Sequence, residues 1–152
     1  MYNRILVPID GSETAQAGLE HAVSLARGQP ATLLLLHLLP GAPALPGGAG
    51  HLRDGALTKD QHRHALELLS RGRQAVEGAG LHCETLLREF TGKSVADAIE
   101  EQALQHRCDL VVIGTHGRRG LAWLAEGSQA QQLARAIRMP LLLVPVPPPP
   151  LP

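Results

Sequence analysis

The sequence CDLVVIGTHGRRG, at residues 108–120, carries the clearest strand signal in the chain. Its first part is rich in β-branched residues and ends at Gly114, a pattern that predicts a buried strand followed by a turn. A related stretch, RILVPIDGS at residues 4–12, runs from an apolar strand into a turn with helix-capping residues. Both stretches therefore predict a core strand that ends in a glycine turn.

Strands and helices alternate along the rest of the chain. The five expected strands lie at residues 4–9, 31–39, 81–89, 108–114 and 141–146. The four expected helices lie at about residues 15–26, 58–77, 91–107, the last opened by Thr91, and 128–137. This alternation predicts an α/β fold, a doubly wound open parallel sheet with helices on both faces. The third strand alternates in polarity, so we expect it nearer a sheet edge.

The chain is expected to form a single nucleotide-binding domain over residues 1–146, with a Pro-rich tail at 147–152. Residues 40–55 are rich in Pro and Gly and are expected to form a mobile loop. The tail is expected to be polyproline II or a frayed terminus.

The composition excludes several classes of protein. Lys plus Arg is 14 and Asp plus Glu is 14, so no overall charge draws the chain to nucleic acid or an anionic membrane. Aromatic residues are only 2%, too few for a platform that stacks single-stranded nucleic acid. The longest apolar run, LLLLHLL, is too short for a membrane span, and we expect no signal peptide. Two isolated cysteines are typical of reduced thiols, which favours a cytoplasmic location.

Site-like residues stand where two of the strands end. The first strand ends at Asp10, before Gly11 and Ser12, and the fourth ends at Gly114. In open parallel sheets a ligand lies outside the carboxyl ends of the strands, so we expect both ends to face one crevice if the two strands are neighbours. Glycines there let the backbone approach a ligand and adopt positive φ, and Ser128 begins a helix whose N-terminus favours phosphate.

The spacing of Gly114, Gly117, Gly127 and Ser128 resembles the ATP-binding motif of the universal stress protein family. The stretches RILVPIDGSE, CDLVVIGTHGRRGL and MPLLLVPV are similar to its first, fourth and fifth strands. The resemblance extends to about Val146. It implies the strand order 3-2-1-4-5 and an adenine nucleotide lying across the ends of strands one and four.

The resemblance also implies roles for individual residues. Asp10 would contact the ribose or base, while Leu38 and Ile113 would wall the adenine. The remaining candidates are Pro8 beside the first turn and the residues that would cradle ribose and phosphates, namely Gly114, Gly117, Gly127, Ser128 and the backbone of Gln129. Family members usually carry an apolar residue where this chain has Gln129, so its side chain differs there while its backbone does not.

The family implies a stress-response or signalling protein that binds ATP with Mg²⁺ and whose nucleotide occupancy modulates dimerisation or partner binding. The loop at 40–55 would close over the base and ribose, and a homodimer would form through Leu141–Val146. Two alternatives stay open: a slow ATP hydrolase using Asp10 and His116, and a nucleotide-free dimeric scaffold in which the glycines only shape a turn.

Other motifs carry less weight. TGKS at residues 91–94 lacks the earlier glycine of a P-loop, because Leu87 stands at that position. His62 and His64 point to different helix faces and make a poor metal pair. His37, on a buried strand, is expected to be a core histidine with its hydrogen bonds satisfied.

Overall fold

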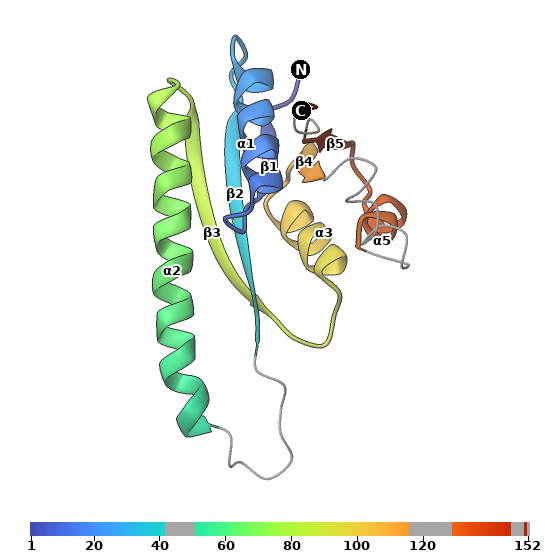
Figure 1. The fold of residues 1–152 in the computed structure, drawn as a ribbon. Helices are drawn as coiled ribbons and strands as arrows, with labels where there is room; N and C mark the ends of the chain where they lie inside the picture. Colours follow the sequence, from blue (N-terminus) through green and yellow to red (C-terminus); the bar gives the residue numbers. More distant parts are fainter. Residues whose placement is uncertain (42–50, 116–128, 147–150, 152) are drawn as a thin grey trace.

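The computed structural model describes residues 1–41, 51–115, 129–146 and 151. Five parallel strands form one sheet in the order β3-β2-β1-β4-β5, which confirms the expected order (Figure 1). The strands are β1 (Arg4–Pro8), β2 (Thr32–Pro40), β3 (His82–Phe90), β4 (Leu110–Thr115) and β5 (Leu141–Pro145). The helices are α1 (Glu13–Ala26), α2 (His51–Gly78), α3 (Val95–Gln105) and α5 (Gln129–Ala136). The alternating α/β architecture is therefore as predicted, and β3 lies at a sheet edge.

The sheet is covered on both faces, and β2 shows why its sequence is apolar throughout. Successive side chains of a strand point to opposite faces. Leu33 and Leu35 pack into a core with α1 and α2, whereas Leu34 and Leu36 pack into a second core with α3 and α5. All four leucines are fully buried. Figure 1 shows α2 lying along β3 at the outer edge of the sheet.

Two helix starts differ from the prediction. The helix α2 begins at His51, so residues 51–55 are helical rather than part of a loop, and residues 42–50 lie outside the described part. A single glycine in a helix costs only about 1 kcal/mol, so Gly55 does not stop it.

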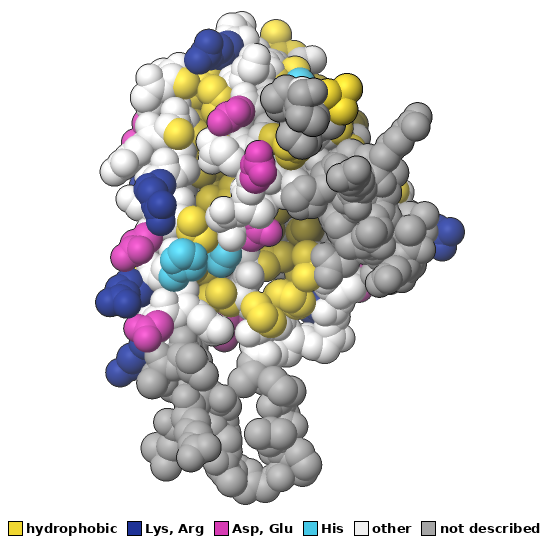
Figure 2. Space-filling view, viewed as in Figure 1, with side chains coloured by type: hydrophobic (Ala, Val, Ile, Leu, Met, Phe, Trp, Pro, Cys, Tyr) yellow, Lys and Arg dark blue, Asp and Glu magenta, His cyan; other side chains and the backbone are white. Residues whose placement is uncertain are grey.

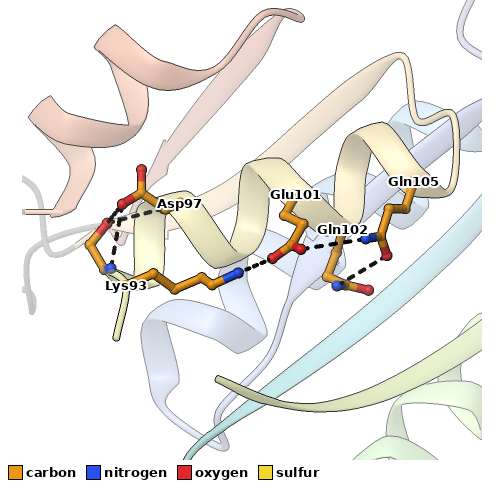
Figure 3. Close-up of polar contacts among 6 residues, drawn as sticks. Lys93, Asp97, Glu101, Gln102 and Gln105 are labelled. Carbon is orange, nitrogen blue, oxygen red and sulfur yellow. Dashed lines mark hydrogen bonds and ion pairs between the residues drawn. The ribbon is translucent and has the colours of Figure 1, made fainter. Parts of the chain in front are cut away.

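The helix α3 begins at Val95 and not at Thr91, because Ser94 accepts from the Asp97 N–H in a capping box. Figure 3 shows Asp97 in this cap and the ion pair of Lys93 with Glu101. The Nζ atom of Lys93 lies 2.5 Å from Oε2 of Glu101.

Two charged side chains, Asp109 and Arg4, connect the strands at the amino end of the sheet. Asp109 accepts from the backbone N–H groups of Asn3 and Arg4, at 2.8 and 3.0 Å. Burial alone would raise the pKa of Asp109, but these hydrogen bonds outweigh it and lower that pKa. Arg4 forms a two-pronged ion pair with Glu84 and also donates to the His106 carbonyl. The hydrogen bond from Arg4 lowers the pKa of Glu84.

The carboxyl end of the sheet opens between β1 and β4. These strands pair only at Ile5–Leu110 and Leu6–Val111, while β4 continues to Thr115 beside β5. The strand β2 also runs on beyond β1, since their register ends at Pro8–Leu36. The strands β1 and β4 are thus neighbours, as the predicted crevice required, and the space beyond the end of β1 is bounded by longer strands on both sides.

Candidate functional site

A pocket of about 650 Å³ lies at the carboxyl ends of β1, β2 and β4, beneath the start of α3. It brings together five of the nine site residues expected from the sequence. These are Pro8, Asp10, Leu38, Ile113 and Gly114. Its other described lining residues are Ile9, Ser12, Thr14, Ala15, Leu36, Pro40, Phe90, Val95, Ala96, Ile99 and Leu133. Figure 2, in the same view as Figure 1, shows hydrophobic side chains gathered in the middle of the molecule, between the positions of α2 and α3.

The remaining four candidates cannot be placed in the same way. Gly117, Gly127 and Ser128 lie outside the described residues, as do His116 and the two arginines at 118 and 119. Gln129 is the first residue of α5, and its side chain also lies outside the described part. The phosphate-cradling half of the expected site therefore stays a prediction.

The polar end of the pocket is a tightly bonded turn that starts α1. The Asp10 carboxylate accepts from the Ser12 N–H at 2.9 Å through Oδ1. Ser12 caps the helix by accepting from the Ala15 N–H at 3.1 Å, and its hydroxyl lies 2.9 Å from that of Thr14. Gly11 has φ of +84°, which a residue with a side chain rarely adopts. The turn holds one oxygen of Asp10 in place at the mouth of the pocket, next to the positive end of the helix dipole.

Gly114 lines the pocket as expected, but it also has a packing role that the sequence did not indicate. Its φ is not positive, since among described glycines only those at 11, 28, 80 and 92 adopt positive φ. A Cβ at Gly114 would lie 1.6 Å from the Thr14 carbonyl oxygen, and one at Gly18 would lie 2.8 Å from the Gly114 nitrogen. The two glycines let α1 lie directly on β4. Gly114 is therefore required first by helix packing, whatever it contributes to a ligand.

The other end of the pocket is apolar. Leu38 and Ile113, the two predicted wall residues, are partly buried and pack against the core formed with α3 and α5. Phe90, Val95 and Ile99 join them and were missed by reasoning from the sequence. Phe90 could have been found as the end of the strand beside β2, but nothing local indicates that α3 turns its first residues toward the pocket.

The backbone of β2 adds polar groups to this apolar end. Ile9 donates to the Leu36 carbonyl at 2.8 Å, which fixes the even-numbered residues of β2 as those whose backbone groups face β1. Leu38 is the next such residue, but β1 has already ended at Pro8. Its N–H and C=O therefore face the pocket side, and Pro40, the next residue of this set, has no N–H.

The pocket holds little acid–base chemistry. Asp10 is the only ionisable side chain among its described lining residues. In the described ranges, no group of three His, Cys, Asp or Glu side chains could hold a metal ion. Over these same residues, no helix is long and apolar enough to cross a membrane. The geometry suits binding of a molecule with an apolar, planar part and a hydroxylated part.

The model of the universal stress protein family matches residues 1–145. The chain belongs to the universal stress protein family. A universal stress protein from Thermus aquaticus is 30% identical over 144 residues, which cover 95% of this chain and 99% of that protein. The structure of universal stress protein UspA from Lactobacillus plantarum shares 26% identity and a TM-score of 0.76, covering 94% and 97% of the two chains.

Two family structures with nucleotides share the fold at lower identity. A family member from Arabidopsis thaliana with AMP bound has 18% identity and a TM-score of 0.69, covering 95% of this chain and 92% of that one. The universal stress protein from Archaeoglobus fulgidus in complex with dAMP has 24% identity and a TM-score of 0.62, covering 94% and 98%. Structural relatives of this chain thus bind adenine nucleotides.

Proposed function

We propose that this protein binds ATP with Mg²⁺ in the pocket beyond β1, and that occupancy modulates dimerisation or partner binding in a stress response. The observation that carries the proposal is the pairing of an apolar slot beside Leu38 with the Asp10 carboxylate at its mouth. A planar base suits the apolar slot, and a ribose suits the carboxylate. The adenine nucleotides bound by the Arabidopsis and Archaeoglobus relatives support the same ligand class.

The base would lie between Leu38, Ile113 and Phe90. The Leu38 N–H and C=O offer a donor and an acceptor that adenine can match with N1 and its amino group, so the polar edge of the base would not be buried unsatisfied. Asp10 would accept from ribose hydroxyls, and a charged acceptor makes such bonds stronger than neutral ones.

The phosphates would extend toward the start of α5 and the glycines at 117 and 127, where free N–H groups of a helix N-terminus favour anions. Mg²⁺ is usually held by substrate phosphates together with one or two carboxylates. Asp10 is the single carboxylate among the described pocket residues, so the phosphates themselves would supply most of the ligands.

Titration calorimetry with ATP and Mg²⁺ tests the proposal, and Asp10→Asn is the sharpest variant. It keeps an oxygen for the Ser12 N–H, so the turn should survive, but removes the charge. We expect about a tenfold loss of affinity, equivalent to about 1.4 kcal/mol. The matched control is Asp60→Asn, on the exposed side of α2, which should leave affinity unchanged. Folded protein that gives no heat at millimolar ATP would exclude the proposal.

The proposed dimer would form through Leu141–Val146. The strand β5 is a sheet edge, and Leu143 is 40% exposed on it. Unpaired strand edges with apolar side chains favour pairing with another chain. Sedimentation of Leu143→Arg should show a shift to monomer, while Leu66→Arg, at a position 58% exposed on α2, should behave as the unmodified chain. An equal dimer fraction in both variants would refute this interface.

A further inference from the structure

The buried histidine of β2 makes one short hydrogen bond at the edge of the pocket. The Nδ1 atom of His37 lies 2.6 Å from the carbonyl oxygen of Ile9, and His37 is 8% exposed. A carbonyl oxygen only accepts, so the ring must carry its proton on Nδ1 and donate. This confirms the expectation that His37 is a core histidine with a hydrogen-bond partner. The partner, the Ile9 carbonyl, lies where the β1–β2 ladder ends.

The Ile9 carbonyl is the acceptor that a continuing sheet would use for Leu38. In a parallel ladder, the bond from Ile9 N–H to the Leu36 carbonyl is followed by one from Leu38 N–H to the Ile9 carbonyl. In the described residues the second bond is replaced by the one from the His37 ring. The His37 ring therefore takes one of the two acceptor positions of the Ile9 carbonyl oxygen, the atom from which a continuing ladder would accept the Leu38 N–H.

We propose that His37 is a positioning residue for base recognition. By occupying the Ile9 carbonyl, it ends the β1–β2 ladder one step early and leaves the Leu38 N–H facing the pocket, where it reads N1 of adenine. The proposal rests on the proposed function, because the base is that of the nucleotide. His37 itself does not touch the ligand: its side chain shares the face of β2 turned toward α2, whereas Leu38 points to the opposite face.

Two substitutions separate the hydrogen bond from simple packing. In His37→Asn, an amide nitrogen stands as far along the side chain as Nδ1 and can donate to the same carbonyl. In His37→Leu, the side chain fills the site without a donor. In His37→Leu, we expect the Leu38 N–H to donate to the Ile9 carbonyl. That N–H would then no longer be available to N1 of the base.

The first measurement is nucleotide selectivity, using AMP and inosine monophosphate (IMP) as probes. At N1, adenine accepts, whereas hypoxanthine carries a proton and donates. The unmodified protein and His37→Asn should prefer AMP by about tenfold, as expected for one hydrogen bond made or lost. His37→Leu should lose about tenfold in AMP affinity with little change for IMP. A purely structural role would instead weaken both nucleotides equally, and that result would overturn the proposal.

The second measurement needs no nucleotide. Amide hydrogen exchange in the free protein should show Leu38 exchanging faster than Leu36 in the unmodified chain, and becoming protected in His37→Leu. Equal protection of Leu38 in both proteins would refute the positioning role. If the unmodified chain binds neither nucleotide, the proposed function fails and base recognition by His37 fails with it. If the chain binds AMP but selectivity is unchanged in His37→Leu, only the role of His37 is wrong.

Discussion

Replacing Gly114 by alanine should destabilise the protein strongly, although the change adds a single methyl group. The new Cβ would lie 1.6 Å from the carbonyl oxygen of Thr14, and contacts of a Cβ below 3.0 Å are essentially never found. The helix α1 would have to move away from β4 by about 1.4 Å, the difference between these two distances. The obstacle is backbone, so no side-chain rotation relieves it.

The size of the effect follows from what α1 buries. Leu19, Ala22 and Ala26 are at most 3% exposed and pack in the core shared with β1 and β4. Protein cores are close-packed, so a shift of more than 1 Å loses contacts along the whole helix. Overpacking a core usually costs about 1–3 kcal/mol, and a backbone clash belongs at the upper end. We expect Gly114→Ala to lose about 3 kcal/mol of its free energy of unfolding.

Urea unfolding measures this loss, and Gly78→Ala is the control. A Cβ at Gly78, the last residue of α2, would meet nothing within 4 Å, and its φ is not positive. Because alanine is the better helix former, that variant should be at least as stable as the unmodified chain, by up to about 1 kcal/mol. The reasoning is wrong if both variants unfold at the same urea concentration as the unmodified chain. If Gly114→Ala were fully stable but did not bind nucleotide, Gly114 would be required for ligand binding rather than for helix packing.

Three further predictions concern the rest of the fold. Ser94→Ala removes the capping box of α3 and should lower the free energy of unfolding by about 1 kcal/mol in urea melts, and an unchanged midpoint would contradict this. Burial raises the pKa of both thiols, Cys83 and Cys108, to about 11, so at pH 8 a disulfide reagent should label native protein about 100-fold more slowly than unfolded protein, and equal rates would contradict this. The folded-state pKa of Asp109 is lowered, so its stabilisation is present above the unfolded pKa and is lost as the pH falls through the folded pKa. Asp109→Asn should therefore flatten the fall in stability below about pH 5 in urea melts, and an unchanged slope would contradict this.

The sequence predicted the fold well because its strands are marked by strong local patterns. The run around Leu33–Leu36 is apolar without alternation, which only a strand buried on both faces needs. Helix starts were less accessible. Ser94 was passed over for Thr91, since both can cap a helix and only the three-dimensional partner of each separates them. The start of α2 was missed because Gly55 resembled a loop residue.

The site was predictable where it depends on strand ends and not where it depends on packing between elements. Asp10 could be chosen because it follows a recognisable strand, whereas Leu38, inside β2, was chosen only through the family resemblance. Val95 lines the pocket because α3 packs on the same face of the sheet as Leu36, which no local pattern indicates. The closeness of Gly114 to Thr14 likewise joins residues a hundred positions apart.

The division of the interior by the sheet also bears on how the sequence can change over time. Leu35 and Leu36 are adjacent in the chain but belong to different cores, separated by the backbone of β2. Leu35 and Leu19 are far apart in the chain, yet both approach the same point of α2 at Gly72. Substitutions on opposite faces should add independently, whereas substitutions sharing a face should compensate one another. Each side of the sheet can therefore change in sequence on its own, and residues that change together will share a face of the sheet rather than be adjacent in a strand.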